Sequence, residues 1–539
     1  MQIVYAVYVS WYGTLNYNQP FAKNQPMYNI KTVRIFQLSL VVLFSMAFGS
    51  ITKEMWQSKY LKVEHDNKIT YTPDERGNII PDFSHVGYQG GDKVIPIIAE
   101  VKTISPTGSE DDQALIQSAI NEVSKRDPDP YGFRGAILLR KGVYKISGTI
   151  SITASGIVLR GEGNGATATK LISTAKKQVT MIAVTGTGNS VEIKGSRIKI
   201  TDDYVPVGSK SFNISSADNL SVGDRIVVFR PGTDAWIHDI KMDQIAARPG
   251  TVQWTAKGYD VQFYRVVTKI EGNKIFIDNP VVMAMETRYG GGEVYKYNFP
   301  GRINNVGIEN IYCESQFVSD TDESHGWIAI AFNKIENAWA KNVTSMFFGN
   351  SCVSMQSEAK NISVVNCSCF EAKSIITGER RYSFSNAGQL NLVMNCQTTE
   401  GRHDYVTGAK SGGPNVFYNS TAKKTHADIG PHQRWAMGTL YDNITTDGAI
   451  NVQDRGNAGS GHGWAGVNNV VWNCTAKIAT IQSPWFSGKN YCIGFQGKKV
   501  EGSFKDRPNG EWEGLNKPNL NPVSLYEAQL KARGIVLPN

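Results

Sequence analysis

The sequence predicts an all-β protein: a single-stranded right-handed parallel β-helix, which is a solenoid, with an N-terminal capping helix and inserted β-hairpin segments. A repeated phrase supports this, because its asparagine recurs at intervals of 24 to 32 residues, a period typical of stacked coils. Each repeat contains short β runs and no helical pattern. The phrase reads ENIYC, KNVTS, VNCSC, MNCQT, YNSTA, DNITT and WNCTA, with its asparagine at Asn310, Asn342, Asn366, Asn395, Asn419, Asn443 and Asn473.

The repeated asparagine indicates a turn, because its side chain tolerates left-handed backbone and forms local hydrogen bonds. The next position reads Ile, Val, Cys, Cys, Ser, Ile and Cys, which is typical of a stack of small side chains facing the core. Cys367, Cys396 and Cys474 are therefore interpreted as core residues, since free cysteine is usually buried.

Residues 1–49 are interpreted as an export signal with an over-long start. The apolar run Ile35–Gly49 follows Lys31 and Arg34 and ends in small residues, as a secretory signal does. A membrane anchor is the alternative, but the run is shorter than the ~20 residues that a spanning helix needs. We expect a secreted or periplasmic protein with no membrane insertion after signal cleavage.

The remaining chain divides into a lead-in segment at 50–91, a β-helix catalytic domain at 92–500 and a C-terminal tail at 501–539. Ser109–Asp112 resembles a capping box before a helical apolar pattern from Leu115 to Val123. Short β runs begin at Ala136. Residues 201–300 fit the repeat poorly and are interpreted as inserted hairpins. Residues 524–532 predict a second, C-terminal capping helix.

The charge balance excludes a broad basic face. Lys and Arg total 56 against 48 acidic residues, and three of the basic residues lie before Gly49. So small a surplus argues against a nucleic-acid partner. A locally cationic groove for an acidic polysaccharide or oligosaccharide remains open.

Registration of the coils predicts one polar face. Arg402 and His426 lie seven residues after a repeated asparagine, and neighbouring coils stack about 4.8 Å apart, so these two residues and His403 should share a face. Polar clusters concentrate on the same coils. The candidate catalytic residues are His403, Arg402, His426, Tyr405 and Tyr382, and the candidate substrate-binding residues are Arg381, Arg434, Trp435, His432, Arg455, His462, Trp464 and His325.

These residue types fit β-elimination at a uronic acid. Arg pairs with the uronate carboxylate, His or Tyr exchanges protons, and Trp stacks on a sugar face. Hydrolysis is the main alternative, because it normally needs two carboxylic acids. Acidic residues do lie in or beside the clusters, at Glu379, Glu400, Asp404, Asp428 and Asp454, so this alternative stays open.

No cofactor is required by the sequence. The metal hypothesis is Ca²⁺ at Asp320, Asp322 and Glu323, where three carboxylates fall within four residues. An acidic solvated turn explains them equally well. Zinc is disfavoured, since no HExxH or close CxxC spacing occurs.

From about Ile79 onward the sequence resembles secreted bacterial β-helix proteins of the pectate-lyase superfamily. The segments that carry this resemblance are PDFSHVGYQGG, SEDDQALIQSAI and GVYKISGTISI. The segments DTDESHGW, GERRYSF, GRHDYVTG, GPHQRWAMGTLYDN and GSGHGWAG are similar to a Bacteroides-type polysaccharide lyase group, the L-rhamnose-α-1,4-D-glucuronate lyases. This resemblance implies elimination at glucuronate with release of rhamnose from arabinogalactan side chains. A β-helix hydrolase, another uronate lyase acting on pectin or a glycosaminoglycan, and a non-catalytic glycan-binding solenoid are the alternatives.

Overall fold

The computed structural model describes residues 54–537. The chain divides into two compact units, Met1–Glu54 and Met55–Asn539, and every element named below belongs to the second. The predicted export signal lies outside the described residues. Within residues 54–537, no helix is both long enough and apolar enough to cross a membrane.

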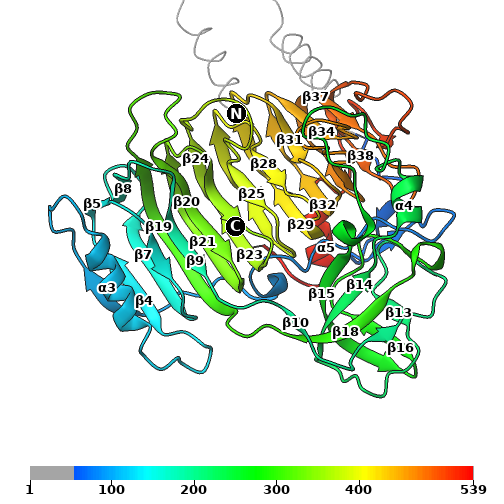
Figure 1. Cartoon of the computed structure of the whole chain (residues 1–539), viewed down its shortest axis with the longest axis horizontal. Helices are drawn as coiled ribbons and strands as arrows, with labels where there is room; N and C mark the ends of the chain where they lie inside the picture. The colour runs from blue at the N-terminus through cyan, green and yellow to red at the C-terminus, as the bar shows by residue number, and fades with distance from the viewer. Residues whose placement is uncertain (1–53, 538–539) are drawn as a thin grey trace, which may run out of the picture. The chain divides into compact units, whose positions relative to one another are not determined.

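The second unit is a right-handed parallel β-helix, as the repeat predicts, and its coils follow one another across Figure 1. Each coil contributes to three parallel sheets. Sheet 1 contains β3 (Glu100–Ile104), β4 (Gly135–Leu139), β7 (Ile157–Gly163), β23 (Ala359–Val365), β26 (Leu392–Met394), β29 (Gly412–Tyr418), β32 (Ala436–Asp442), β35 (Gly466–Val467), β36 (Val470–Trp472), β38 (Tyr491–Ile493) and β40 (Glu511–Glu513).

Sheet 2 follows sheet 1 in each coil. It contains β5 (Gly142–Ile146), β8 (Thr169–Ser173), β24 (Ser368–Phe370), β27 (Gln397–Thr399), β30 (Thr421–Lys423), β33 (Thr445–Thr446) and β39 (Gln496–Lys499). Two longer strands, β19 (Ile303–Ser315) and β21 (Ile335–Met346), pass from sheet 1 into sheet 2.

Sheet 3 completes each coil. It contains β6 (Ile150–Ile152), β9 (Val179–Thr185), β20 (Gly326–Asn333), β22 (Ser351–Met355), β25 (Phe384–Asn386), β28 (Tyr405–Thr407), β31 (Asp428–Pro431) and β34 (Ala449–Val452). The strand β37 (Thr475–Ile481) passes from sheet 2 into sheet 3.

The repeated asparagines form one row at the turn between sheets 1 and 2, the asparagine row. All seven have positive φ angles, between 45° and 57°. Three neighbouring pairs are joined by side-chain hydrogen bonds: Asn342 to Asn310 at 3.0 Å, Asn419 to Asn395 at 2.7 Å, and Asn473 to Asn443 at 2.9 Å. The predicted registration of the coils is therefore confirmed.

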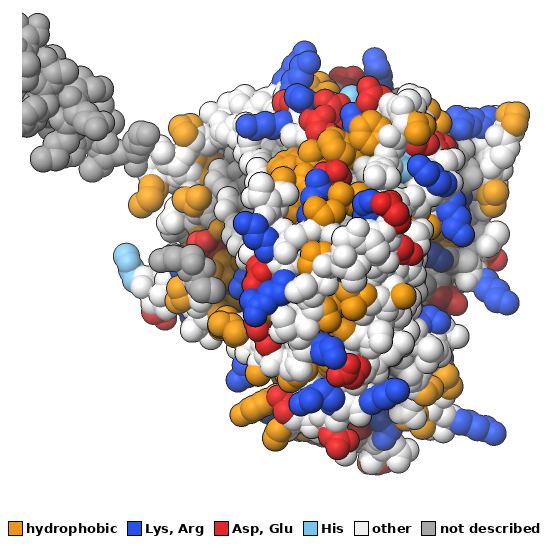
Figure 2. Space-filling model, turned by 90° about the vertical axis from the view of Figure 1, so that its left-hand side faces the viewer, with side chains coloured by type: hydrophobic (Ala, Val, Ile, Leu, Met, Phe, Trp, Pro, Cys, Tyr) orange, Lys and Arg blue, Asp and Glu red, His pale blue; other side chains and the backbone are white. Residues whose placement is uncertain are grey.

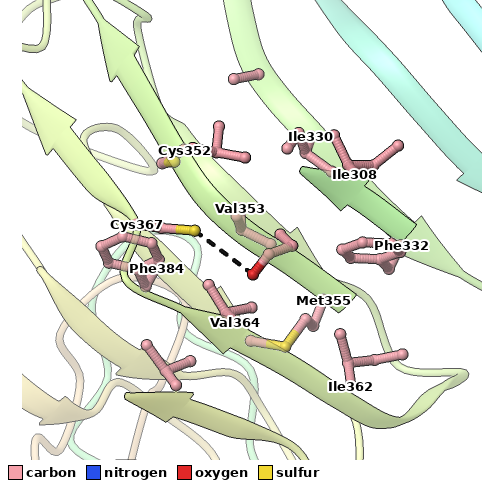
Figure 3. Close-up of a cluster of buried hydrophobic side chains, with 14 of the residues drawn as sticks. Ile308, Ile330, Phe332, Cys352, Val353, Met355, Ile362, Val364, Cys367 and Phe384 are labelled. Atoms are coloured by element: carbon pink, nitrogen blue, oxygen red, sulfur yellow. Dashed lines mark hydrogen bonds between the residues drawn. The ribbon is translucent and has the colours of Figure 1, made fainter. Parts of the chain in front are cut away.

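The core of the solenoid is a continuous stack of aliphatic, aromatic and cysteine side chains. Cys352, Val364, Cys367 and Phe384 all belong to this core (Figure 3). All seven cysteines are buried free thiols, which confirms the interpretation of Cys367, Cys396 and Cys474 as core residues. Burial raises the pKa of the Cys313 thiol, so these cysteines pack as small apolar residues.

Two helices cover apolar edges of the unit. The first, α3 (Gln113–Val123), buries Ile116, Ala119, Ile120 and Val123 against the first coils. Asp111, rather than Ser109, accepts a hydrogen bond from the first backbone N–H of α3. The end of the unit on which α3 lies carries interspersed acidic and basic side chains (Figure 2). The second, α5 (Leu525–Ala532), is capped by Ser524, and the strand β40 continues sheet 1 into the segment interpreted as a tail.

An inserted unit with its own core interrupts the solenoid between β9 and β19 (Figure 1). Its antiparallel sheet contains β10 (Val191–Glu192), β11 (Ile198–Lys199), β13 (Ser211–Asn213), β14 (Arg225–Arg230), β15 (Val261–Glu271), β16 (Lys274–Ile277) and β18 (Glu293–Asn298). The helix α4 (Asp234–Asp239) and the pair β12 (Tyr204–Val205) with β17 (Met285–Glu286) complete it. A separate hairpin, β1 (Leu61–Val63) with β2 (Ile69–Tyr71), precedes the solenoid.

Candidate functional site

The candidate site lies where two sets of loops meet at sheet 3. The segments that join sheet 2 to sheet 3 form the polar loop row, and those that join sheet 3 back to sheet 1 are the return loops. Tyr382 and His403 come from the polar loop row, whereas His432, Arg455 and His462 come from the return loops. With Asp428, the first residue of β31, they make up the histidine cluster.

The aromatic rings of the cluster are packed against one another. The ring centroids of His403 and His432 are 4.5 Å apart, and those of His432 and His462 are 5.0 Å apart. Tyr382 lies 5.1 Å from His403 and 5.5 Å from His432. Because coil stacking aligns the loops, five residues predicted to form the site are in contact although they span eighty residues of sequence.

His403 and Asp428 form a buried pair. His403 is only 2% exposed, and its Nδ1 lies 3.0 Å from the Asp428 carboxylate and 2.8 Å from the Asp428 carbonyl oxygen. Both partners are acceptors, so Nδ1 carries the proton and Nε2 holds the lone pair of the neutral ring. Nε2 is buried and has no hydrogen-bond partner among the described residues.

Asp428 stays ionised in this position. Burial would raise the pKa of Asp428, but the hydrogen bond from His403 and the charge of Arg455 lower it well below its usual range. Arg455 Nη2 also donates to the Asp428 carboxylate. A fixed negative charge therefore orients the His403 ring.

The tautomer of His432 follows from its two partners. Arg455 Nη1 lies 3.3 Å from Nδ1, and the Tyr382 hydroxyl lies 3.2 Å from Nε2. Because arginine can only donate, Nδ1 accepts and Nε2 carries the proton. The Tyr382 oxygen then accepts from His432, which leaves its own O–H free to donate elsewhere.

Burial and neighbouring positive groups keep the outer histidines neutral. Burial, with the positive charge of Arg455 nearby, lowers the pKa of His432 to about 2. Burial, with Arg455 and Arg434 nearby, lowers the pKa of His462 to about 4. Burial also raises the pKa of the half-buried Tyr382 hydroxyl, so Tyr382 is a neutral proton donor.

The inserted unit supports the return loop that carries His462. Arg248 Nη2 donates to the Gly459 carbonyl oxygen at 2.9 Å, and Trp254 Nε1 donates to the Gly461 carbonyl oxygen at 3.2 Å. Arg434 donates to Ser460 from the neighbouring return loop. Arg434 therefore holds a loop rather than presenting its charge freely, which revises its predicted binding role.

The prediction that Trp435 and Trp464 stack on a sugar is wrong. Trp435 and Trp464 are almost completely buried in the core of the inserted unit. The Trp435 ring meets Trp236 at 5.0 Å, and Trp464 Nε1 donates to the Ile240 carbonyl oxygen at 3.1 Å. Neither ring can stack on a sugar, because Trp435 is only 1% exposed and Trp464 is not exposed at all.

Two further candidates are structural. Tyr405 points into the solenoid, where its ring stacks on Phe384 and its hydroxyl donates to backbone carbonyls, so it cannot reach a substrate. Arg381 is buried and donates to carbonyl oxygens of Ser374 and Glu400. It holds the long loop 371–383, whose conformation the sequence alone does not specify.

His426 forms no interaction with the histidine cluster among the described residues and is paired with Glu400 instead. Its Nε2 is 2.7 Å from Glu400, and among residues 54–537 no hydrogen bond, ion pair or ring contact joins it to His403. Arg402 is half-buried and donates to the Gly378 carbonyl oxygen. Arg402, His403 and His426 lie on one loop row, as predicted, but His426 does not contact His403.

The metal hypothesis is also corrected. Asp320 pairs with Lys373, Glu323 pairs with Arg380, and Asp322 accepts backbone N–H bonds from Val318 and Ser324. No group of three potential metal ligands gathers anywhere in the described part of the chain. His325, predicted to bind substrate, is buried between Ser315 and the Lys373 carbonyl oxygen.

The contact of Asp428 with His403 was not predicted, because the sequence offered Asp428 only as one of five acids for hydrolysis. Its sequence signal was the registration itself, because β28 pairs with β31 so that Val406 faces Gly430. Counting back two positions places Asp428 beside Asp404, next to His403. No repeat in the sequence predicts the contacts by which the inserted unit supports the return loop of His462.

No family model matches the chain, and no curated protein matches it. Solved structures do. The tailspike protein gp49 of Pseudomonas phage LKA1 is 13% identical, with 75% of this chain and 74% of that chain covered and a TM-score of 0.34. An alginate lyase from Paenibacillus sp. str. FPU-7 is 10% identical, with coverages of 77% and 99% and a TM-score of 0.38. The catalytic domain of a GH87 α-1,3-glucanase, solved with nigerose, is 13% identical, with coverages of 80% and 67% and a TM-score of 0.32. These likenesses carry no argument about activity.

Proposed function

We propose that the protein is a polysaccharide lyase that cleaves a uronate-containing glycan by β-elimination at the histidine cluster. The observation that carries the proposal is the neutral Tyr382 hydroxyl, which is free to donate, beside the unpaired Nε2 of His403. An elimination needs these two groups, a proton donor for the leaving oxygen and a base for the proton α to the carboxylate.

The roles follow from the assigned protons. His403 Nε2 takes the α proton and becomes an imidazolium that Asp428 stabilises. The Tyr382 O–H gives its proton to the leaving oxygen. The C–O bond breaks as the new double bond forms, and no water is consumed. Because His403 Nε2 is buried, this step requires the side chains around it to move so that the α proton can reach the nitrogen.

The cationic groups suit the carboxylate of the substrate. Arg455 and the half-buried Arg402 flank Tyr382, and both charges act to lower the pKa of its hydroxyl. Negative charge builds up on the uronate carboxylate as the α proton leaves, so positive groups here stabilise the transition state more than the ground state.

Hydrolysis by a carboxylic acid pair has less support. Asp404 is buried inside the solenoid and hydrogen-bonded to Thr398 and Ser383. Asp454 is fully buried and paired with Arg507. Of the five acidic residues considered for hydrolysis, these two cannot reach a glycosidic bond, and Asp428 is committed to His403 and Arg455.

The substrate proposed is glucuronate capped by rhamnose on arabinogalactan side chains, which rests on the sequence resemblance. The test is incubation of the purified protein with arabinogalactan, pectin and glycosaminoglycan in oxygen-18-labelled water. We expect products that absorb as unsaturated uronates and carry no oxygen-18 at the cleaved bond. Labelled saturated products would indicate hydrolysis, and binding without products would indicate a glycan-binding solenoid.

A further inference from the structure

A cavity lies on the polar loop row, toward the α3 end of the solenoid. Its volume is about 380 Å³. It is built from the segments that follow β8, β19 and β21, whereas Tyr382 and His403 lie in the segments that precede β25 and β28. Its lining includes Lys176, Glu314, Phe317, Asp322 and Phe347.

An aromatic pair forms the apolar part of this cavity. The rings of Phe317 and Phe347 are 5.1 Å apart, and Phe317 remains 36% exposed. The Lys373 ammonium lies 5.3 Å from the Phe317 ring and is held by Asp320. An exposed ring held in place and surrounded by polar groups offers a sugar both a stacking face and hydrogen-bond partners.

The charges of the lining residues offset one another. Glu314 pairs with Lys170 at 2.7 Å. Asp322 is held by two backbone N–H groups, and the positive charge of Lys176 acts on it. The histidine cluster, in contrast, is flanked by Arg402 and Arg455. The cavity therefore suits an uncharged sugar better than a uronate.

Stacking of the coils relates the cavity to the histidine cluster. β21 pairs with β24, β24 pairs with β27, and β27 leads into the loop that carries His403. Phe347 is therefore two coils from His403, or about 10 Å at the usual strand spacing. A glycan lying along the loop row can occupy both places with a few sugar residues.

We propose that this cavity is a distal subsite for a neutral sugar residue of the same glycan whose uronate reacts at the histidine cluster. The inference rests on the proposed function for the identity of the reacting residue. The neutral-sugar preference itself rests only on the aromatic pair and the offset charges.

The test compares Phe317→Ala with Phe486→Ala, whose phenylalanine is equally exposed at 36% but packs against Arg288 of the inserted unit. Each variant is titrated calorimetrically with arabinogalactan oligosaccharides from which the uronate residues have been removed. We expect Phe317→Ala to weaken binding about three- to tenfold and Phe486→Ala to bind as the wild type does. Melting temperatures show that both variants are folded.

Equal affinity in the wild type and both variants, or no binding by the wild type, would overturn the subsite. A kinetic arm then separates this inference from the proposed function. Phe317→Ala should raise KM for the polysaccharide and leave cleavage of the smallest reactive oligosaccharide unchanged. Loss of neutral-oligosaccharide binding in Phe317→Ala, with no lyase activity in the wild type, would support the subsite and refute the lyase proposal.

Discussion

The asparagine row and the polar loop row belong to the same coils but differ in how closely successive coils match. In the asparagine row, each coil repeats one residue in one left-handed conformation, and side chains bond from coil to coil. In the polar loop row, the connection shortens from 371–383 to 400–404 and then 424–427. The identical turns hold the register of the coils, and the variable loops gather different side chains at one place.

This comparison predicts that variants of the loop-row residues in the histidine cluster lose activity and that variants in the asparagine row lose stability. The largest expected effect is that of His403→Gln, which removes the proposed base and keeps a polar side chain. We expect turnover to fall about a hundredfold or more. Steady-state kinetics on a uronate glycan give the effect, and near-wild-type turnover in a folded variant would refute the assignment.

Asn395→Ala tests the other row. It removes the acceptor for Asn419 and places alanine at a φ of 55°, so we expect a loss of about 1–2 kcal/mol of unfolding free energy. Asn395→Gly is the matched control, because glycine accepts this backbone conformation and should lose less. Denaturant unfolding measures both, and a catalytic defect without a stability defect would contradict the division of roles.

The pH dependence of stability tests the neutral histidines. His432 and His462 have lowered pKa values in the folded protein, about 2 and about 4, so below the unfolded value of about 6.5 the unfolded chain binds protons that the folded protein does not. Stability should therefore decrease as pH falls from about 6.5 toward 4. His462→Gln should reduce this decrease, and an unchanged slope would show that His462 is not kept neutral by folding.

His426→Ala has the smallest expected effect. His426 is paired with Glu400 outside the histidine cluster, so we expect turnover to change by no more than a few-fold. The registration argument taken from the sequence predicts a much larger loss. A loss comparable to that of His403→Gln would restore His426 to the centre and would require the loops to rearrange when substrate binds.

The sequence predicted the fold well because the fold repeats. The motif of an asparagine followed by a core-facing residue occurs seven times in the sequence. The structure confirms both the turn at the asparagine and the burial of the cysteines. The site was predicted in part. Tyr382, His403, His432, Arg455 and His462 come together, because registration depends on the same repeat.

The remaining site predictions failed for two physical reasons. Side chains alternate between the two faces of a strand, and Tyr405 of β28 lies on the face that packs into the core. An error of one residue in the predicted register is enough to reverse this assignment. Trp435 and Trp464 are covered by the inserted unit, whose packing depends on long-range contacts that no local pattern encodes. The carboxylates at Asp320 and Glu323 find basic partners more than fifty residues away.

The central claim is that Tyr382 donates the proton to the leaving oxygen. Tyr382→Phe removes one oxygen atom and keeps the ring that packs on His403 and His432, so its effect on turnover isolates this proton. We expect the release of unsaturated uronate by Tyr382→Phe to fall about a hundredfold or more while the glycan still binds. Release of the same product at the wild-type rate would show that Tyr382 is not the proton donor.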